Sequence, residues 1–304
     1  MSFSVTILGS SSALPTMDRY PTAHLVNHDE RFFLIDCGEG AQIQLRRFRK
    51  RFGKINHIFI SHLHGDHVFG LFGLISTFSL LGRKSELHIY APARLEDFLK
   101  IHTEFFDHEM TYPIRFHPIQ AKQSELIYED AKLTVTTIPL KHRIPCTGFL
   151  FREKPKDRKV RKEKIAEYKL SLADILKVKE GQDLESEKYG VLLNDELTLP
   201  GPRARSYAFC TDTLCRDGIV DQIRNVDVLY HEATFRADDA KLAKDTYHST
   251  SAQAATIAKK ANAGKLIIGH FSSRYKEIES LLKEAKSIFP NTVLAQEGDD
   301  HIID

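Results

Sequence analysis

The chain has 304 residues, of which 42% are hydrophobic and 28% charged, and its formal net charge is +2. This composition is typical of a globular protein with a substantial core, and the small net charge excludes a protein that binds polyanions over its whole surface. No apolar run approaches the ~20 residues that a membrane-spanning helix needs. The N-terminus, "MSFSVTILG", lacks the basic stretch of a signal peptide. Cys37, Cys146, Cys210 and Cys215 form no Cys-x-x-Cys pair, which predicts free thiols in a reducing, cytoplasmic environment.

The first half of the chain alternates short strands with helices. Runs of apolar and β-branched residues predict strands at residues 3–9, 32–36, 55–60, 87–92 and 132–140. The stretches 68–82 and 93–102 have the length and apolar spacing of helices.

The composition then changes over residues 152–200. The segment "REKPKDRKVRKEK", residues 152–164, contains eight Lys/Arg and three Asp/Glu, and the residues after it include few apolar side chains. We interpret 152–200 as an arm inserted into a single domain that spans residues 1–304, because the strand and helix pattern resumes afterwards.

The second half repeats the pattern of the first. Strands are predicted within residues 205–213 and 226–235, a helix and a strand within 251–271, and another helix and strand within 275–295. Strands and helices that recur in each half predict two sheets covered by helices, an α/β sandwich in several layers.

The segment "SHLHGDHVFG", residues 61–70, is a candidate metal site. His62 and His64 have the i, i+2 spacing that places two side chains on one face of an extended chain. Gly65 permits a turn after which Asp66 and His67 can point toward a neighbouring position. Imidazole and carboxylate groups are ligands that zinc accepts, so this loop can begin two adjacent metal half-sites that other loops complete. The alternative is a solvated loop rich in histidine.

The motif "HLHGDH" resembles the His-x-His-x-Asp-His signature of the metallo-β-lactamase superfamily. The resemblance implies a four-layer αβ/βα sandwich with metal at one edge of the sheets, and further ligands at the ends of later strands. His142, Asp212 and His270 follow apolar strands in the expected order. With His62, His64, Asp66 and His67 they would hold two zinc ions per subunit, with Asp212 bridging them. Two close dications lower the pKa of water, so such a site is suited to hydrolysis.

Five further segments resemble the ribonuclease Z family, whose members remove the 3′ trailer from precursor tRNA. They are "LGSSSALPT" at 8–16, "DCGEGAQIQL" at 36–45, "HEAT" at 231–234, "HST" at 248–250 and "GHFSSRY" at 269–275. The resemblance implies that His248 protonates the departing 3′ oxygen, that Glu232 orients His248, and that Asp66 takes a proton from the attacking water. A histidine with a near-neutral pKa suits the first role. For His248 the structural alternative is a surface histidine before a helix, and for Glu232 it is a carboxylate at a helix start.

The arm fits an RNA-processing enzyme, because concentrated basic residues bind phosphates. In the ribonuclease Z family the arm clamps the tRNA elbow, and one subunit of a homodimer presents its arm to tRNA cut by the other. The candidate RNA-binding residues are Arg152, Lys154, Lys156, Arg158, Lys159, Arg161 and Lys162. A solvated, mobile charged hairpin is the alternative interpretation.

The sequence departs from the family pattern in three places. The loop Pro15–Tyr20 reads Pro-Thr-Met-Asp-Arg-Tyr where bacterial members read Pro-x-Lys-x-Arg-Asn, and in the family this loop lies near the path of the RNA 3′ end. The arm segment 169–182 lacks the family's Gly-Pro turn, and Thr211 stands where glycine is usual.

Two other functions fit parts of the same pattern. A hydrolase of a small phosphodiester or ester would need the metal residues but not the arm. A non-catalytic RNA-binding subunit would keep the arm, but it would not require the whole set of ligands together with His248.

Overall fold

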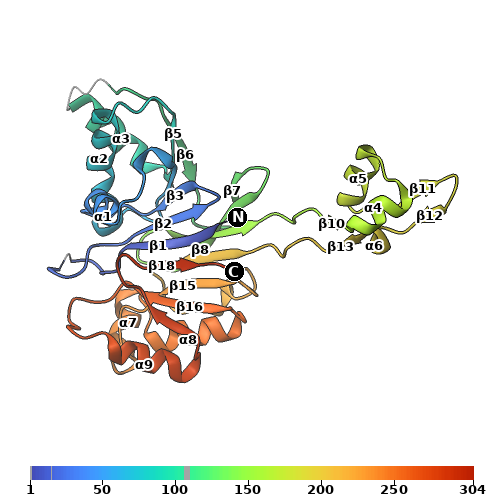
Figure 1. The fold of residues 1–304 in the computed structure, drawn as a ribbon. Helices are drawn as coiled ribbons and strands as arrows, with labels where there is room; N and C mark the ends of the chain where they lie inside the picture. Colours follow the sequence, from blue (N-terminus) through green and yellow to red (C-terminus); the bar gives the residue numbers. More distant parts are fainter. Residues whose placement is uncertain (1, 15, 106–109) are drawn as a thin grey trace. The chain divides into compact units, whose positions relative to one another are not determined.

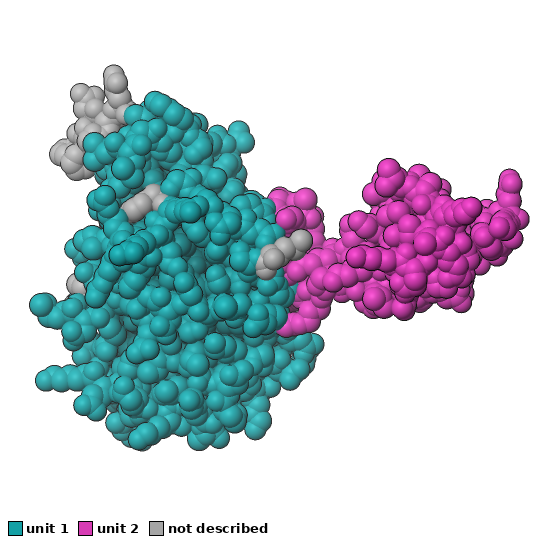
Figure 2. Space-filling view, viewed as in Figure 1, with its two compact units in different colours: residues 1–128, 135–151, 205–304 teal, residues 129–134, 152–204 magenta. Residues whose placement is uncertain are grey.

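The computed structural model describes residues 2–14, 16–105 and 110–304 (Figure 1). The chain divides into two compact units, shown in different colours in Figure 2. The main unit comprises Met1–Tyr128, Val135–Phe151 and Arg205–Asp304, and the arm unit comprises Glu129–Thr134 and Arg152–Ala204. The insertion expected at residues 152–200 lies within the arm unit. Among the described residues, no helix has the length and apolar character needed to cross a membrane.

The first sheet of the main unit has the strand order β18-β1-β2-β3-β4-β5-β6. Its strands are β1 (Phe3–Gly9), β2 (Ala23–His28), β3 (Arg31–Ile35), β4 (Ile55–Phe59), β5 (Leu87–Pro92), β6 (Ile114–Ile119) and β18 (Asp300–Ile302). Strands β3 to β6 pair in parallel, whereas β1 pairs antiparallel with β2 and with β18. The outer face of this sheet packs against α1 (Ala41–Arg47), α2 (Gly65–Leu80) and α3 (Arg94–Phe105).

The second sheet has the order β17-β16-β15-β14-β9-β8-β7. Its strands are β7 (Leu126–Glu129), β8 (Leu133–Leu140), β9 (Cys146–Glu153), β14 (Ser206–Cys210), β15 (Val228–Glu232), β16 (Lys265–Gly269) and β17 (Thr292–Leu294). Strands β14 to β17 are parallel. The helices α7 (Ala240–Thr246), α8 (Ser251–Lys260) and α9 (Glu279–Ile288) lie on the outer side of this sheet (Figure 1).

The two sheets pack face to face through aromatic rings. The ring centroid of Phe59 in β4 lies 5.5 Å from that of Phe149 and 5.6 Å from that of Phe151, both in β9. All three side chains are fully buried. Helices outside and sheets inside give the four layers that the sequence predicts, and the predicted fold class is confirmed. Because the parallel strands of each sheet end at the same edge, loops that are distant in sequence meet there.

The arm unit has more regular structure than its composition predicts. It contains β10 (Lys159–Val160), α4 (Lys162–Tyr168), α5 (Leu172–Lys179), β11 (Leu184–Ser186), β12 (Gly190–Leu192), α6 (Asn194–Leu197) and β13 (Thr198–Leu199). Its small core consists of Val178, Leu184, Leu192 and Leu197, which come from four different elements. Because these four core residues are widely separated in sequence, no single periodic run of apolar residues predicts this core.

Candidate metal centre

Each residue predicted to bind metal lies in the segment that follows a strand of the main unit, either in a loop or in the first turn of a helix. His62 and His64 lie between β4 and α2, and Asp66 and His67 occupy the first turn of α2. His142 follows β8, Asp212 follows β14, and His270 follows β16. The structure brings all seven side chains together at one edge of the two sheets. Their role as ligands stays a prediction.

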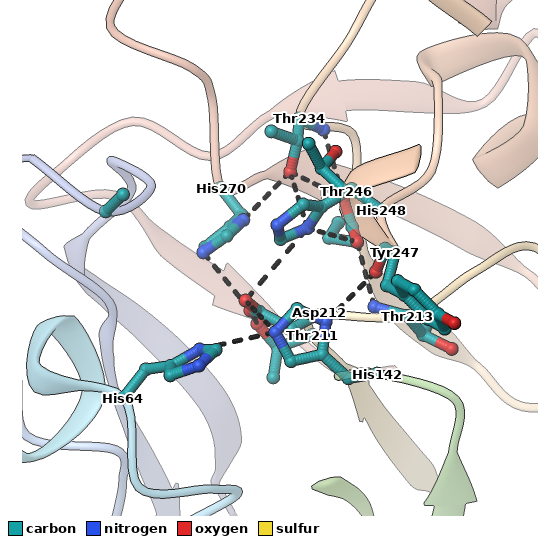
Figure 3. A network of polar contacts seen from close by, with 12 residues as sticks. His64, His142, Thr211, Asp212, Thr213, Thr234, Thr246, Tyr247, His248 and His270 are labelled. Carbon is teal, nitrogen blue, oxygen red and sulfur yellow. Dashed lines mark hydrogen bonds and ion pairs between the residues drawn. The ribbon is translucent and has the colours of Figure 1, made fainter. Parts of the chain in front are cut away.

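One cluster gathers three histidines beside Asp212. The Nε2 atoms of His62 and His142 each lie 3.6 Å from the Asp212 Oδ2 atom. The Nδ1 atom of His64 lies 3.0 Å from His62 Nε2 and 3.3 Å from His142 Nε2. The rings of His64 and His142 lie beside Asp212 in Figure 3. All four residues bring a ligand atom within 4.8 Å of the others, close enough to share one cation.

A second cluster lies on the other carboxylate oxygen of Asp212. Its Oδ1 atom is 3.3 Å from the Nε2 atom of His67 and 3.1 Å from that of His270. Asp66 Oδ2 lies 3.4 Å and 3.6 Å from the same two nitrogens. Because its two oxygens face different clusters, Asp212 is positioned to bridge two cations.

The unpaired atoms of this site fit bound cations. Within the described residues, Nε2 of His67 and Nε2 of His270 are buried and have no hydrogen-bond partner. Burial opposes the charged form of His67, yet the carboxylates of Asp66, Asp212 and Asp36 raise its pKa well above the ordinary value. That excess of negative charge is what a bound cation offsets, and nitrogen and carboxylate donors suit zinc.

The histidines of the first cluster are held in the form that a metal requires. Burial lowers the pKa of His62, His64 and His142, so the neutral imidazole is favoured. Burial works in the opposite direction on Asp212, but the charges of nearby histidines outweigh it and hold the pKa of Asp212 well below its usual range. Neutral imidazole and ionised carboxylate are the ligating forms.

Several buried groups that orient the histidines were not predicted from the sequence. Asp36 accepts a hydrogen bond from His67 Nδ1 at 2.7 Å, and the Tyr247 carbonyl lies 3.0 Å from His142 Nδ1. Thr234 Oγ1 lies 2.9 Å from His270 Nδ1 (Figure 3). These contacts fix which ring nitrogen faces the metal. Asp36 and Thr234 belong to the segments "DCGEG" and "HEAT", but no local spacing reveals their contacts.

Left-handed backbone conformations occur at several residues of this site. The φ angle is 55° at Asp36, 62° at Tyr247 and 60° at His270. Such conformations cost about 1–3 kcal/mol each in residues other than glycine and persist only where the surroundings enforce them. Their concentration around the metal residues indicates that the site geometry is imposed by the fold.

Asp36→Asn is expected to weaken zinc binding by roughly 10- to 100-fold, the usual effect of removing such a partner. The Asp36 carboxylate also accepts hydrogen bonds from the Ser61 amide at 2.7 Å and the Ser61 hydroxyl at 2.8 Å. The Ser61 amide donates to Oδ1, whereas the Ser61 hydroxyl and His67 Nδ1 both donate to Oδ2. An asparagine oxygen can replace only one of these two oxygens, and the amide lacks the negative charge that holds His67. Competition with a chelator measures the dissociation constant, and Asp221→Asn is the control because that side chain is 90% exposed. Unchanged zinc affinity in Asp36→Asn would contradict this role.

Next to the metal residues lies the Glu232–His248 pair. Glu232 ends β15 and is fully buried, and His248 lies in the loop before α8. The Nδ1 atom of His248 is 3.0 Å from Glu232 Oε1. Glu232 also accepts hydrogen bonds from the Thr213 amide at 2.8 Å and the Thr234 hydroxyl at 2.6 Å, so the carboxylate is held rigidly.

This pairing favours a protonated His248. Burial acts to lower the pKa of His248, but the charge and hydrogen bond of Glu232 outweigh burial and raise the pKa to about 9. For Glu232, burial opposes ionisation, and the charge of His248 nevertheless lowers its pKa. Asp212, His248 and His270 also bring ligand atoms within 4.8 Å of one another. The hydrogen bond to Glu232 occupies Nδ1 and favours proton donation over metal binding.

His248 lines a cavity of about 590 Å³ together with all of the predicted metal ligands except His62 and His67. Its walls include the described residues Ser12, Ala13, Glu39, Asp66, Phe69, His142, Arg143, Asp212, Phe235, His248 and His270. The cavity is therefore polar at its base, where the metal residues lie, and carries apolar rings on its walls.

The loop between β1 and β2 forms part of this cavity. The backbone amide of Ala13 donates a hydrogen bond to Asp66 Oδ2 at 2.8 Å. Glu297 Oε1 accepts a hydrogen bond from the amide of Tyr20 at 2.6 Å and holds the far end of the loop. Pro15, the first residue of the altered loop motif, lies outside the described residues, whereas Arg19 donates to the Tyr275 carbonyl at 3.1 Å.

The predicted RNA-binding residues lie on the arm unit, and several are paired with acidic side chains. Lys154 contacts Glu129 at 2.5 Å and Lys156 contacts Glu153 at 2.8 Å, whereas Arg158 contacts Asp195 at 2.5 Å. Arg152, Lys159 and Lys162 are exposed, and Arg161 is half-buried. The charge available to a ligand is therefore smaller than the sequence count indicates.

Comparison with known proteins gives the family. Residues 3–155 match the family model described as Anti-Pycsar protein Apyc1, which covers the "HLHGDH" motif and His142 but none of the later site residues. Ribonuclease Z of Bacteroides fragilis (strain YCH46) is 50% identical over 296 residues, covering 97% of each chain.

Solved structures agree with this result. The short form of human tRNase Z superposes with a TM-score of 0.73 at 28% identity, covering 99% of each chain. The metallo-β-lactamase fold protein YhfI from Bacillus subtilis, 19% identical, gives 0.70 and covers 99% of this chain and 98% of its own, a likeness of fold alone. Because the ribonuclease Z similarity spans both halves and the arm, the chain belongs to the ribonuclease Z family.

Proposed function

We propose that this protein is a metal-dependent endoribonuclease that hydrolyses a phosphodiester of precursor tRNA, removes the 3′ trailer and leaves a 3′-hydroxyl, with two zinc ions per subunit. The observation that carries the proposal is the two-cluster arrangement around Asp212, in a chain 50% identical to a ribonuclease Z over 97% of its length. Six donor side chains placed around the Asp212 carboxylate support two metal positions and not one.

The two clusters would hold zinc with His62, His64, His142 and Asp212 on one side and Asp66, His67, His270 and Asp212 on the other. Zinc bound there would polarise the oxygens of the phosphodiester and acidify water.

The remaining steps belong to the side chains. Asp66, whose Oδ2 atom is held by the Ala13 amide, is positioned to accept a proton as water attacks phosphorus. The bond between phosphorus and the 3′ oxygen then breaks, and protonated His248 donates its proton to that oxygen. Glu232 keeps His248 protonated and oriented through the 3.0 Å contact with Nδ1.

The arm unit is proposed to bind the body of the tRNA through its phosphates. Lys159 and Lys162 are the strongest candidates because both are exposed and lie close together in sequence, Lys159 in β10 and Lys162 at the start of α4. Lys154 and Lys156 contribute less in this account, because their ammonium groups already contact carboxylates.

Replacing Lys159 and Lys162 together by alanine is expected to weaken precursor tRNA binding and to reduce the slope of log affinity against log salt by roughly 1.5. Each phosphate that the protein no longer neutralises lowers this slope by about 0.7–0.9, because fewer counterions are released on binding. The matched control replaces Lys154 and Lys156 and should change the slope less. Equal slopes for the two double variants would contradict the assignment.

The same variants separate this function from hydrolysis of a small phosphodiester or ester. An enzyme for small substrates has no use for the arm, so the double variant would leave all of its activity intact. For a tRNA enzyme we expect slower precursor cleavage at low RNA concentration, whereas hydrolysis of bis(p-nitrophenyl) phosphate continues at the wild-type rate.

A homodimer and a cytoplasmic location are part of the proposal. Large apolar side chains are exposed on α1 and at the end of α2, among them Ile43 at 55%, Leu80 at 87% and Leu81 at 60%, and such positions support a subunit interface. The four cysteines, all within the described residues, are free thiols, which supports a reducing compartment.

A further inference from the structure

Phe69 is an exposed aromatic side chain on the wall of the catalytic cavity. Of the two phenylalanines among the described lining residues, Phe235 is 5% exposed and Phe69 is 66% exposed. Most of this large apolar side chain is left uncovered by the main unit, in a cavity that it shares with Asp66 and Asp212. It is available to a ligand that enters the cavity.

The position of the ring follows from the helix that carries it. Phe69 lies one turn after Gly65, and long side chains on a helix lean back toward its N-terminus. A Cβ atom placed on Gly65 would lie 2.2 Å from Phe69 Cε2, so the ring covers the bare backbone of Gly65. It therefore lies over the helical turn that bears Asp66.

A bound RNA substrate would place its nucleobases, which are flat aromatic groups, in the cavity beside Phe69. The phosphodiester that is cut must reach Asp66 and Asp212. The two nucleotides that it joins therefore lie next to the predicted metal residues. The trailer side of that bond is single-stranded, and unpaired bases stack on aromatic side chains in proteins that bind RNA without sequence preference. Every base offers a π face, and an enzyme that processes many tRNAs needs such tolerance.

We propose that Phe69 is a stacking platform for a nucleobase next to the cleaved phosphodiester. This inference rests on the proposed function, since it requires an RNA substrate. By stacking on the base, Phe69 positions the phosphate that is cut next to the metal residues. It takes no part in proton transfer.

The test compares Phe69→Ala, Phe69→Leu and Phe69→Trp on precursor tRNA under conditions that report kcat/KM. We expect Phe69→Ala to lower kcat/KM by roughly 5- to 150-fold, the range for loss of one stacked base, and Phe69→Trp to stay within about threefold of wild type. Phe98→Ala is the matched control, because Phe98 is 65% exposed on α3 but does not line the cavity. It should cleave like wild type.

Substrates with one abasic nucleotide identify the base that is held. One substrate lacks the base 5′ of the cleaved bond, and the other lacks the base 3′ of it. For the substrate missing the stacked base, wild type and Phe69→Ala should cleave at the same rate, and this result names the nucleotide.

Three results would contradict the proposal that Phe69 stacks on a nucleobase. They are an equal loss for Phe69→Ala on the intact and both abasic substrates, wild-type activity in Phe69→Leu, and a change of oligomeric state in sedimentation on replacing Phe69. Failure of the proposed function is distinguishable, because wild type would then leave the intact precursor uncut.

Discussion

Asp212→Ala is expected to abolish cleavage of precursor tRNA, with a loss of more than about 10⁴-fold, the scale seen when a central catalytic group is removed. Asp212 is the residue that both clusters share, since Oδ1 contacts His67 and His270 whereas Oδ2 contacts His62 and His142. Its removal leaves two groups of histidines with no carboxylate between them. Neither cation then retains its full set of donors.

The measurement is zinc content per subunit together with the single-turnover cleavage rate. We expect the stoichiometry to fall from two to one or fewer. Asp217→Ala is the control, because this aspartate lies on the surface, pairs with Lys260 at 2.7 Å and is 69% exposed. An Asp212→Ala protein that keeps two zinc ions and cleaves at the wild-type rate would remove the basis for a shared bridging carboxylate.

His248→Ala is expected to slow cleavage by roughly 10²- to 10⁴-fold while both metals stay bound. That range is the usual contribution of a positioned acid. His248 contacts Glu232 at 3.0 Å but lies 4.0 Å from Asp212 Oδ2, so its removal leaves the metal donors intact. Measuring the zinc content of the variant distinguishes between His248 as a proton donor and His248 as a metal ligand. Loss of zinc would reassign His248 as a ligand.

The partner of His248 gives this prediction a pH signature. An acid works while it is protonated, so activity should persist below the pKa of His248 and fall as pH rises through it. Glu232→Gln removes the charge that raises the pKa of His248. The alkaline limb of the rate profile should therefore move to lower pH. If Glu232→Gln cleaves more slowly at every pH but its alkaline limb does not move, Glu232 has only a structural role.

Part of the clustered set was visible in the sequence because its pattern is local. His62, His64, Asp66 and His67 lie within six positions, and His142, Asp212 and His270 each follow an apolar strand. The family resemblance singled out these three residues, and the fold brings their loops to one edge of the sheets. The predicted strands and helices of the main unit correspond to β1, β3, β4, β5, β8 and β14 to β17 and to α2, α3, α8 and α9.

What the sequence did not reveal depends on tertiary contacts. The Tyr247 carbonyl that orients His142 is a backbone atom, and residue type carries no signal for it. Strand β18 forms only by pairing with β1, in which His301 lies opposite Val5 almost the whole chain away. In the arm unit, Val178 and Leu192 belong to one small core although they lie in different elements, α5 and β12. Pairing and sparse cores of this kind become visible only in three dimensions.

This protein is proposed to cut precursor tRNA with metals held around Asp212. The most direct test incubates the purified wild-type protein with a precursor tRNA that carries a 3′ trailer, before and after removal of metal by a chelator. We expect one cut that leaves a 3′-hydroxyl on the tRNA, loss of that cut on chelation, and its return when zinc is added. Intact precursor in the presence of zinc-loaded protein would contradict this proposal.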